Sequence, residues 1–518
     1  MKPRRSTVAA VALAALLAAG ASFATRADAA TTLSNTGFEI GGATATPPGW
    51  TEYGQAAAAF SEAGGHTGGY RLTHYAASAY RVETYQYLSG IANGSYTLWA
   101  WARSGGGATG AYIALRNCGG AENRTAVPVS DTWQLISVTT TVTSGQCTVS
   151  LASDGPGGSW ANFDDVRLVR AASAGSTIAI RGADISTLKK AEDRGAVHRD
   201  AAGTRQDALR ILRSSGVNYA RLKVWVNPAD GYNTKARVLT MAARAKADGM
   251  RLLIDFHYSD TWADPGKQFK PSAWSGYSVS QLSSAVYNHT YDVLSALKAQ
   301  GTTADMVQVG NEINDGMLWP EGRSGNWANL ATFLKSGISA VKAVDSSTRV
   351  MLHLAEGGNN TQHRWWFDQA VARGVPFDVI GVSHYLYWHG TAASLQANIV
   401  DLSQRYNRDV LVAETSYGFT LAQDDAEANV FTSALQRAAG YTASPQGQSD
   451  ALRAVLNAVR AVPNGRGLGV VYWEPTWTAV PGNGWDPADP ASGNGWENQA
   501  LFDYSDRALP ALAVLGSG

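Results

Sequence analysis

The sequence predicts two folds in succession, an all-β antiparallel sandwich and then an α/β domain of the (β/α)8 (TIM) barrel class. The chain has 518 residues, enough for one such barrel of about 250 to 400 residues and one smaller domain. Up to about residue 172, short runs alternate apolar and polar residues between turn-forming residues. Beyond that point, apolar runs alternate with longer stretches of helical period, which is the pattern of repeated βα units.

The composition indicates a globular chain without an overall acidic or basic field. Lys and Arg together number 42, and so do Asp and Glu, so the formal net charge is zero. We therefore expect neither nucleic acid nor a membrane surface as a partner, since both attract basic chains. The chain also contains 17 Trp and 21 Tyr residues. Aromatic rings with a polar edge suit the apolar faces and hydroxyl groups of a carbohydrate.

Residues 1–30 have the features of a secretory signal peptide. A basic start precedes an Ala-, Leu- and Val-rich run, and the small-residue site Ala27-Asp28-Ala29 follows. We therefore expect the chain to be secreted to the extracellular space. An uncleaved anchor is the alternative, since residues 8–24 are nearly long enough to span a bilayer. The pair Arg4-Arg5 leaves export by the Sec or the Tat route open.

Residues 31–172 predict the antiparallel β-sandwich. Their strand-like runs are short, are separated by Gly, Asn, Ser and Pro, and lack a helical period. The clearest of them cover residues 95–104, 111–117, 133–142, 147–153 and 163–171.

The chain's two cysteines, Cys118 and Cys147, lie in or beside two of these strand-like runs. An oxidising compartment favours a disulfide between them. Two separate buried thiols are the alternative.

A small, polar linker is predicted at residues 173–176, and the barrel domain at residues 177–518. Eight apolar runs in this second domain fit buried parallel strands, and Ala- and Leu-rich helical stretches separate them. The runs begin at Ile178, Asn218, Arg251, Asp305, Arg349, Asp378, Asp409 and Gly467.

Each predicted strand ends in a polar, charged or aromatic residue. The catalytic groups of such barrels lie at the carboxyl ends of the strands. A charged residue at that place does not stabilise the apolar core of the barrel. These residues are Asp184, Arg221, His257, Glu312, Glu356, His384, Glu414 and Glu474.

Two of these residues, Glu312 and Glu414, follow the fourth and seventh strands. A pair of carboxylates across a barrel mouth is what glycoside hydrolysis requires: one protonates the leaving oxygen and one attacks the anomeric carbon. The alternative is that both are solvated loop residues.

The motifs VGNEIN and VAETSY around these glutamates resemble those of clan A retaining glycosidases. More narrowly, the second domain is similar to glycoside hydrolase family 53, the endo-β-1,4-galactanases, over about residues 177–507. The matching runs are RGADIS, RLKVW, DFHYSDTWADPGKQFKPSAW, QVGNEINDGMLWP, GVSHYLYWHG, AETSYGFT and VYWEPTW. This resemblance implies internal cleavage of β-1,4-galactan, as in type I arabinogalactan, without a catalytic cofactor.

The resemblance also implies roles for single residues. Glu312 matches the acid/base, Glu414 the nucleophile and Asn311 the amide that binds the sugar 2-hydroxyl. Arg221 matches the arginine beside the nucleophile, where a fixed cation keeps a carboxylate ionised. Four more residues match positions around the reacting sugar, and Trp473 matches the aromatic floor beneath it. The four are Asp184, His257, His384 and Tyr385.

Some members of the family bind structural calcium after the seventh strand, through an alternating acidic run. Here Asp425, Glu427 and Asn429 keep oxygen ligands in alternation, which suits Ca²⁺. Gln423 replaces the first acidic position, and Glu427 replaces a usual histidine. A solvated helix N-terminus fits this run equally well.

The N-terminal domain is loosely similar to carbohydrate-binding modules of family 61, through NTGFE, PPGW and WANFDDVRLV. These motifs occur in many such modules and assign no sugar-contacting residue. Two other functions stay open. One is another clan A endo-β-1,4-glycanase, such as a glucanase, mannanase or xylanase. The other is a catalytically inactive galactan-binding protein, against which the presence of both Glu312 and Glu414 argues.

Overall fold

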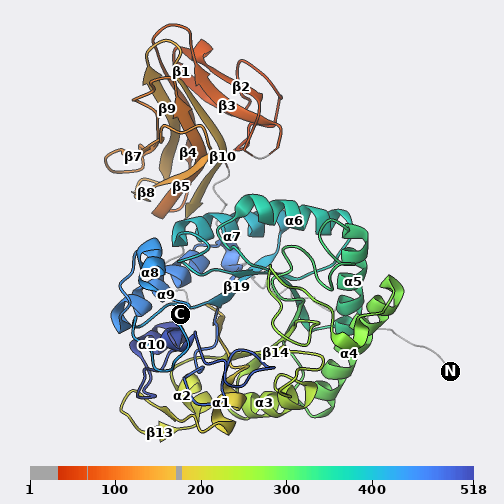
Figure 1. The fold of residues 1–518 in the computed structure, drawn as a ribbon. Helices are drawn as coiled ribbons and strands as arrows, with labels where there is room; N and C mark the ends of the chain where they lie inside the picture. The colour runs from red at the N-terminus through yellow and green to blue at the C-terminus, as the bar shows by residue number, and fades with distance from the viewer. Residues whose placement is uncertain (1–32, 67, 171–177) are drawn as a thin grey trace, which may run out of the picture.

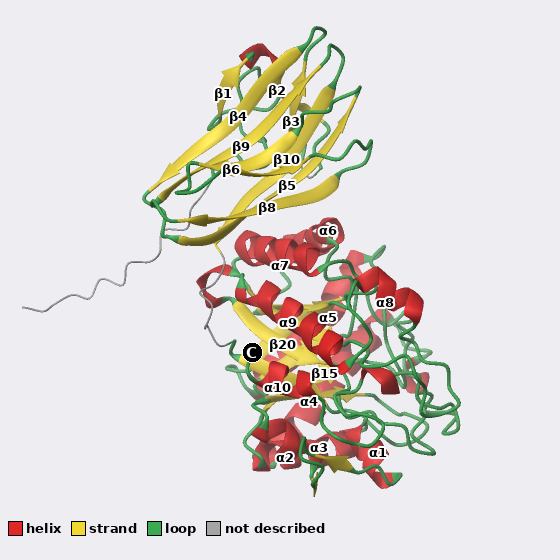
Figure 2. Cartoon of the chain, turned by 90° about the vertical axis from the view of Figure 1, so that its left-hand side faces the viewer, coloured by secondary structure: helices red, strands yellow, loops and turns green. Residues whose placement is uncertain are grey.

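A computed structural model describes residues 33–66, 68–170 and 178–518, which form two domains (Figure 1). The predicted signal peptide (1–30) and linker (173–176) lie outside the described residues. The domain boundaries at residues 31, 172 and 177 therefore stay predictions. Figure 2 shows strands in the first domain and both strands and helices in the second.

The first domain is the predicted antiparallel sandwich. Its elements are β1 (Thr51–Gly54), the 3-10 helix η1 (Ala56–Ala58), β2 (Ala59–Ala63), β3 (Tyr70–Tyr75), β4 (Tyr80–Ser89), β5 (Gly94–Gly105), β6 (Tyr112–Arg116), β7 (Asn123–Ala126), β8 (Gln134–Val142), β9 (Gln146–Gly155) and β10 (Trp160–Arg170). One sheet has the order β1–β4–β9–β6–β7 and the other the order β2–β3–β10–β5–β8. We refer to them as the distal sheet and the proximal sheet.

Alternation along each strand divides the sandwich into a core and two outer faces. Along β5, Leu98, Ala100 and Ala102 enter the core, whereas Trp101 and Arg103 point outward. The predicted disulfide between Cys118 and Cys147 is formed and closes a sequence separation of 29 residues.

The second domain is the predicted barrel, and all eight predicted strands are present. They are β11 (Ile180–Asp184), β14 (Tyr219–Val224), β15 (Arg251–Phe256), β16 (Met306–Val309), β17 (Arg349–Leu354), β18 (Val379–Ser383), β19 (Asp409–Thr415) and β20 (Gly467–Tyr472). Each pairs in parallel with the next, and β11 pairs with β20 to close the barrel.

Helices surround the barrel (Figure 1). They are α1 (Leu188–Asp193), α2 (Ala208–Ser214), α3 (Lys235–Ala247), α4 (Val279–Ala299), α5 (Trp327–Val344), α6 (Asn360–Ala372), α7 (Ala392–Tyr406), α8 (Ser433–Ala439), α9 (Pro445–Arg460) and α10 (Pro510–Gly516). The loops add a hairpin and three 3-10 helices: β12 (His198–Arg199), β13 (Arg205–Gln206), η2 (Ser272–Trp274), η3 (Pro463–Gly465) and η4 (Glu497–Gln499).

Side chains at the helix starts explain where several helices begin. Ser278 and Gln281 form a reciprocal capping box on α4, which satisfies two backbone groups that the first turn leaves unpaired. Thr391 and Ser444 cap α7 and α9 through their hydroxyl groups. These local contacts fix the residues at which α4, α7 and α9 begin.

The interior of the barrel changes from apolar to charged along the strands. Its lower layer is an apolar cluster that includes Tyr219, Leu253, Met306 and Met351. Two residues further along these strands, the inward positions are Arg221, Asp255, Gln308 and His353, all buried. Because successive inward positions differ by two residues, each of these four strands itself delivers a polar group to the mouth of the barrel.

A buried ion-pair network joins the two domains. Arg167 of β10 pairs with Asp401 of α7 at 2.6 Å, and Arg364 of α6 pairs with Asp165 at 3.1 Å and with Asp401 at 2.6 Å. All four side chains are 6–14% exposed. Trp99 of β5 packs against the core of the barrel domain. Removing one partner of a buried pair is costly, so this network fixes the sandwich against α6 and α7 (Figure 2).

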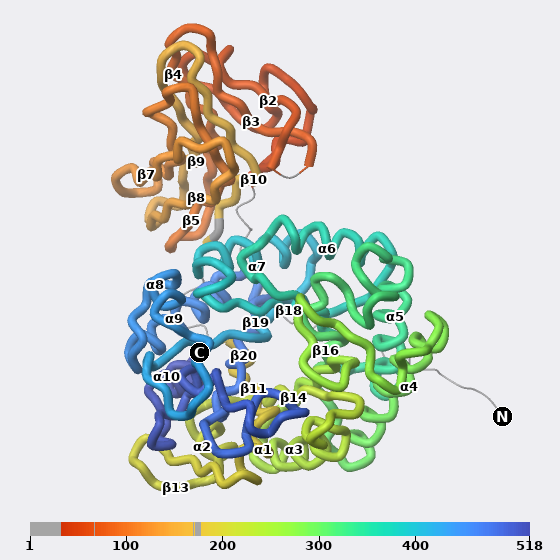
Figure 3. The backbone as a smooth tube through the Cα atoms, in the orientation of Figure 1, coloured from red at the N-terminus to blue at the C-terminus, as the bar shows by residue number. Residues whose placement is uncertain are grey.

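The chain end returns to the start of the barrel (Figure 3). The backbone N–H of Ile178 donates to the carbonyl of Gly518 at 3.2 Å. Among the described residues, no helix combines the length and the apolarity needed to cross a bilayer.

Candidate active site

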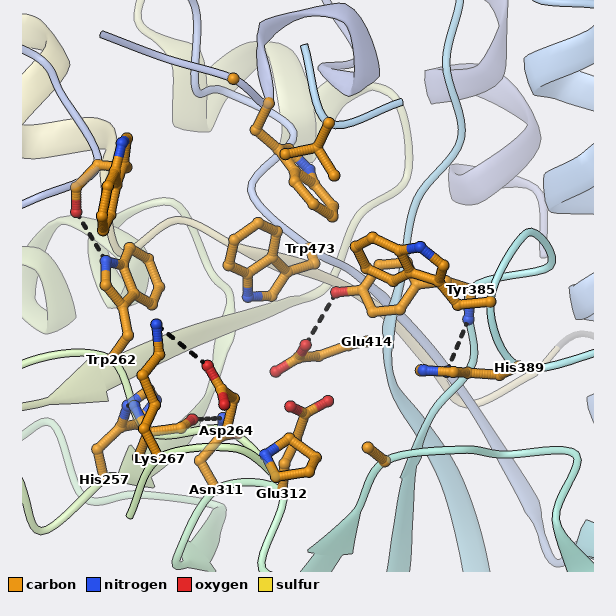
Figure 4. A pocket seen from close by; sticks show the side chains of 18 of the residues that line it. His257, Trp262, Asp264, Lys267, Asn311, Glu312, Tyr385, His389, Glu414 and Trp473 are labelled. Atoms are coloured by element: carbon orange, nitrogen blue, oxygen red, sulfur yellow. Dashed lines mark hydrogen bonds and ion pairs between the residues drawn. The ribbon is translucent and has the colours of Figure 1, made fainter. Parts of the chain in front are cut away.

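A pocket of about 590 Å³ opens at the carboxyl ends of the barrel strands (Figure 4). Six tryptophans line it together with a group of polar and charged residues. The tryptophans are Trp262, Trp388, Trp473, Trp477, Trp485 and Trp496. The polar and charged group includes His257, Asp264, Lys267, Asn311, Glu312, Glu356, Tyr385, His389, Glu414 and Glu427.

Glu312 and Glu414 meet at the floor of this pocket. Glu414 belongs to β19, and Glu312 follows β16 with φ 47°, a left-handed conformation that is uncommon outside glycine. Figure 4 shows their carboxyl groups pointing toward each other. One carboxylate oxygen of Glu312 lies within 4.8 Å of one of Glu414.

Arg221 connects Glu414 to the layer below the pocket. Its guanidinium donates to Glu414 at 2.8 Å, to Asp184 at 2.8 Å and to Asp255 at 2.9 Å. Burial alone would lower the pKa of Arg221, but the three carboxylates outweigh burial and raise it. Arg221 is 1% exposed, so it is a permanent cation beneath the pocket.

The two carboxyl groups share one proton unequally. Burial and the neighbouring Glu414 carboxylate raise the pKa of Glu312 well above its usual range. Burial also raises the pKa of Glu414, but Arg221 and the Tyr385 hydroxyl act against that rise. Because the cation contacts Glu414 directly, we assign the proton to Glu312 and the charge to Glu414.

Asn311 is held from below and leaves one donor for a ligand. Its Oδ1 accepts from Arg221 and from Gln308, both at 2.8 Å, and its Nδ2 donates to the carbonyl of Ala263 at 2.9 Å. An amide nitrogen carries two hydrogens, so one N–H of Asn311 remains for a bound molecule.

His353 completes the layer beneath the two glutamates. One ring nitrogen is 2.9 Å from Gln308 and the other is 2.9 Å from Ser383. Burial and Arg221 lower the pKa of His353 well below its usual range, so the ring is neutral. These bonds use both ring nitrogens, and they account for the proximity of His353 to Glu312 and Glu414 without a metal ion.

Tyr385 orients the Glu414 carboxylate from above. Its hydroxyl donates to Oε2 of Glu414 at 2.9 Å (Figure 4). Burial and the negative charge of Glu414 raise the pKa of Tyr385 well above its usual range, so the phenol keeps its proton. Glu414 is therefore held by Arg221 on one oxygen and by Tyr385 on the other.

His257 lines the pocket in a single tautomer. Its Nδ1 accepts from the indole N–H of Trp225 and the backbone N–H of Ala263, both at 3.2 Å. Its Nε2 therefore carries the hydrogen and donates to Asp255 at 3.0 Å.

A buried lysine supports the aromatic wall of the pocket. Lys223 pairs with Glu474 at 2.8 Å, and its ammonium lies 3.7 Å from the centroid of the Trp262 ring. Burial raises the pKa of Glu474 to about 7, although Lys223 lowers it. The indole of Trp262 also donates to the carbonyl of Trp485 at 2.7 Å. These contacts fix the ring of Trp262 beside Trp473.

The sequence pattern described as Glycosyl hydrolase family 53 matches residues 180–515, which is more than half of the chain. The chain belongs to glycosyl hydrolase family 53. The match covers all eight barrel strands and every residue of the pocket described above.

Individual relatives agree with this family. The solved GH53 catalytic domain of Ignisphaera aggregans is 42% identical, with a TM-score of 0.64, and the alignment covers 67% of this chain and 98% of that one. A solved fungal β-1,4-galactanase is 33% identical, with a TM-score of 0.57, covering 65% and 99%. The arabinogalactan endo-beta-1,4-galactanase of Cellvibrio japonicus is 37% identical over 347 residues, covering 64% and 89%.

In this family 53 hydrolase, the residues predicted from the sequence fall into two layers. Six of them line the pocket: His257, Asn311, Glu312, Tyr385, Glu414 and Trp473. Asp184, Arg221 and His384 are buried below it and, as placed, do not line it. Their direct contact with a substrate stays a prediction. Arg221 contacts Glu414 directly, and Asp184 contacts Arg221.

His389 takes the pocket position that the sequence assigns to His384. Both histidines lie after β18, but His384 is fully buried, whereas His389 lines the pocket. Burial lowers the pKa of His384 to about 3 and that of His389 to about 4. Both rings are therefore neutral. The turn Tyr385–His389, in which the N–H of His389 bonds to the carbonyl of Tyr385 at 2.8 Å, brings the second histidine back to the pocket.

Four polar residues of the site do not stand at a strand end, where the sequence predicts functional groups. Asp255, Gln308, His353 and Lys223 are polar residues inside apolar strand runs. Their position at every second residue, counted back from the strand end, is the signal that identifies them as inward-facing.

One of the predicted calcium ligands, Asp425, is engaged with the backbone. The two carboxylate oxygens of Asp425 accept from the backbone N–H groups of Glu427 and Asn494, both at 2.7 Å. Glu427 lines the pocket. Within the described chain, no third acidic or histidine ligand lies within 4.8 Å of both carboxylates. Calcium takes about six to eight oxygen ligands, amide and carbonyl oxygens and water among them, so the site at Asp425, Glu427 and Asn429 stays a prediction.

Proposed function

We propose that this chain is a secreted, retaining endo-β-1,4-galactanase that cleaves internal bonds of β-1,4-galactan, including the backbone of type I arabinogalactan. The names of its relatives support the substrate: a β-1,4-galactanase and an arabinogalactan endo-beta-1,4-galactanase. The signal-like residues 1–30 support secretion.

One observation carries the stereochemical part of the proposal. The nearest carboxylate oxygens of Glu312 and Glu414 are within 4.8 Å of each other. Retaining glycosidases separate their two carboxyl groups by about 5–5.5 Å, and inverting enzymes need about 6.5–9.5 Å to admit a water molecule. The short separation supports direct attack by a carboxylate.

The reaction then has two steps. Glu414, kept ionised by Arg221, attacks the anomeric carbon while Glu312 gives its proton to the leaving glycosidic oxygen. This forms an α-linked glycosyl ester on Glu414. Glu312, now ionised, takes a proton from water, and the water oxygen displaces Glu414 to restore the β configuration. The remaining N–H of Asn311 is the donor for the sugar 2-hydroxyl.

The aromatic lining of the pocket supports binding of a galactan segment. Trp473 and its neighbouring tryptophans give flat apolar surfaces that suit the C–H faces of galactose. The tethered N-terminal domain, through its resemblance to family 61 modules, supports a role in holding the polysaccharide near the barrel.

The test is NMR of the first product that the full chain releases from galactan. We expect the β anomer before mutarotation mixes it, and oligosaccharides rather than galactose alone. An initial α anomer would overturn the retaining mechanism, and galactose as the only product would overturn the endo assignment. Reducing-sugar release from mannan, xylan or β-glucan, but not galactan, would favour another clan A glycanase. Release from none of the four would favour a catalytically inactive galactan-binding protein.

A further inference from the structure

Helices α6 and α7 lie between the sandwich and the barrel strands (Figure 2). We propose that the docked sandwich is a structural part of the active site. Through Arg167 and Asp165 it sets the position of α6, and α6 in turn holds the backbone that carries Glu312. Arg167 and Asp165 are then positioning residues for a reaction in the other domain. The role of Glu312 as the acid rests on the proposed function.

One side of α6 faces the sandwich. Its Arg364 donates to Asp165 at 3.1 Å and to the two carboxylate oxygens of Asp401 at 2.6 and 2.7 Å. Arg167 reaches the same Asp401 from the sandwich at 2.6 Å and also donates to the carbonyl of Ala397 of α7 at 3.2 Å. The sandwich therefore holds α6 through Asp165 and α7 through Arg167, and Asp401 joins the two helices.

A second contact lies about one turn earlier on the same side of α6. Oγ1 of Thr361 is 3.2 Å from Nε2 of His66, and Nδ1 of His66 is 2.9 Å from Asp165. The ring of His66 stacks on Trp101 of β5 at a centroid distance of 3.9 Å. Thr361 and Arg364 are three residues apart, so their side chains project from one side of the helix. The sandwich thus fixes α6 at two points along its axis.

The opposite side of α6 supports the backbone at the barrel mouth. The indole N–H of Trp366 donates at 3.0 Å to the carbonyl of Ile313, the residue directly after Glu312. Nε2 of His363 lies 2.7 Å from the carbonyl of Ala355, which lines the pocket. At about 3.6 residues per turn, His363 and Trp366 project from the side opposite to the sandwich-facing pair. One helix therefore contacts the sandwich with one side and the mouth with the other.

The backbone of Glu312 depends on this support. Its φ is 47°, a left-handed conformation that persists only where the surrounding structure holds it. Asn314 holds the same segment: its Oδ1 accepts from the backbone N–H of Ala355 at 2.7 Å, and its Nδ2 donates to Gln362 of α6 at 3.2 Å. Trp366 and Gln362 of α6 thus bond to the two residues that follow Glu312.

A buried row of side chains connects the two sides within the barrel domain. Nδ2 of Asn360 donates to Asp401 at 2.6 Å and to Oδ1 of Asn398 at 3.0 Å. Nδ2 of Asn398 donates in turn to the carbonyl of Gly357 at 2.7 Å and to Nδ1 of His363 at 2.8 Å. Asn360 and Asn398 are 4% and 0% exposed. Because solvent does not replace these bonds, a shift of Asp401 is passed to the loop after β17.

Loss of the docking contacts should displace the acid more than the nucleophile. Glu414 lies on β19 and is held by Arg221 and Tyr385, neither of which belongs to α6 or to the sandwich. A misplacement of about 1 Å can lower a rate about 10²-fold. The acid matters most for a poor leaving group, since a good leaving group departs without its proton. A displaced Glu312 therefore has a kinetic signature of its own.

The experiment compares Arg167→Met, Arg167→Lys and Arg116→Met in the full chain. Arg116 also belongs to the sandwich and pairs with Glu83 at 2.7 Å, but on the distal sheet. Its replacement is the matched control, because it removes the same groups without touching the contact between the domains. kcat and KM are measured with galactotetraose and with an aryl galactobioside whose phenolate leaves readily.

Hydrogen exchange provides a readout that needs no substrate. The backbone N–H of Ile313 donates to the carbonyl of His353 at 3.0 Å, and that of Ala355 donates to Asn314. Both amides lie in the segments that α6 holds. Mass spectrometry of the peptides that contain them reports how often this backbone opens.

We expect Arg167→Met to lower kcat for galactotetraose about tenfold, with little change in KM and a smaller loss for the aryl substrate. Exchange at Ile313 and Ala355 should become faster, whereas exchange along β19 should not change. Arg167→Lys keeps the charge and should restore most of the turnover, and Arg116→Met should match the unaltered chain. If Arg167→Met fails to fold, Asp165→Asn decides, because asparagine keeps the shape of the side chain and tolerates its positive φ of 47°.

Turnover or exchange that Arg167→Met leaves unchanged would overturn the proposal. Equal losses on both substrates would also overturn it, because they would show that the acid is not displaced selectively. A failure of the proposed function is distinct from both. The unaltered chain would then release no reducing sugar from galactan, and hydrogen exchange alone would decide whether the sandwich positions this backbone.

Discussion

The barrel mouth and the outer face of the proximal sheet use similar residue types in opposite ways. At the mouth, Arg221 and its three carboxylate partners are buried, and the carboxylates raise the pKa of Arg221. On the sheet, Arg71, Arg103, Glu62 and Asp131 line a shallow depression of about 410 Å³ and balance one another in charge. Bond cleavage needs unequal, desolvated charges, whereas holding a neutral polymer needs exposed rings and ordered donors.

The largest effect should come from removing either carboxyl group at the mouth. Glu312→Ala and Glu414→Ala should each lower galactotetraose turnover by at least about 10²- to 10⁴-fold, the usual contribution of general acid–base catalysis. Adsorption to insoluble galactan should persist through the N-terminal domain. Initial rates with galactotetraose provide the measurement.

Glu356→Ala is the matched control for this prediction. Glu356 also follows a barrel strand, has a positive φ of 63° and lines the pocket, but it does not contact Glu414. Its replacement should cost less than about tenfold. An equal loss in all three variants would show that any change in the pocket lining abolishes turnover.

The next largest effect should follow from replacing the buried cation. Arg221→Met leaves Asp184, Asp255 and Glu414 without their common partner. Breaking a buried ion pair costs about 3–5 kcal/mol of unfolding free energy, which urea denaturation measures. Turnover should fall as well, because Glu414 loses the neighbouring cation that keeps its carboxylate ionised. Arg323→Met, which removes a half-exposed pair with Asp315, should cost less than about 1 kcal/mol. Similar costs in both variants would contradict the central role of Arg221.

The disulfide should affect the sandwich and not the mouth. Replacing Cys118 and Cys147 by Ser should lower the unfolding free energy of the sandwich by about 3.6 kcal/mol, given the length of the loop that the bond closes. Calorimetry of the full chain should show this loss, while galactotetraose turnover stays at the level of the unaltered chain. A parallel fall in turnover would contradict this prediction, because it would show that the disulfide also affects the barrel mouth.

The smallest effect should come from removing calcium. Because Asp425 already accepts two backbone N–H groups, we expect EDTA and added Ca²⁺ to leave the melting temperature unchanged. A ligand bound to the native state would raise it by mass action. A clear rise with Ca²⁺ would support the site predicted at Asp425, Glu427 and Asn429.

Much of the barrel is predictable from the sequence, because its strands are buried on both sides. Such strands appear as continuous apolar runs, and all eight predicted runs form barrel strands. Glu312 and Glu414 are the residues that end two of these runs. A closed barrel brings all strand ends to one mouth, so the sequence predicts that these two glutamates lie close together.

Other features depend on pairing between distant segments, which a single sequence does not display. The register of β3, β10 and β5 is one such feature, because it places Trp160 directly opposite both Tyr75 and Gly105. The exchange of His384 for His389 depends on the turn after β18 rather than on residue type. The ion pairs between the domains likewise join positions more than 190 residues apart, such as Asp165 and Arg364.

The ion-pair network between the domains also bears on how such enzymes can be recombined. Arg167 and Asp165 belong to the sandwich, whereas Asp401 and Arg364 belong to helices α7 and α6 of the barrel. A foreign module spliced at the linker would lack Arg167 and Asp165 and would leave Asp401 and Arg364 at a solvent-exposed surface. Helices α6 and α7 of the barrel thus determine which N-terminal domain can form these ion pairs. Exchange of modules in this enzyme would have to transplant both halves of the network together.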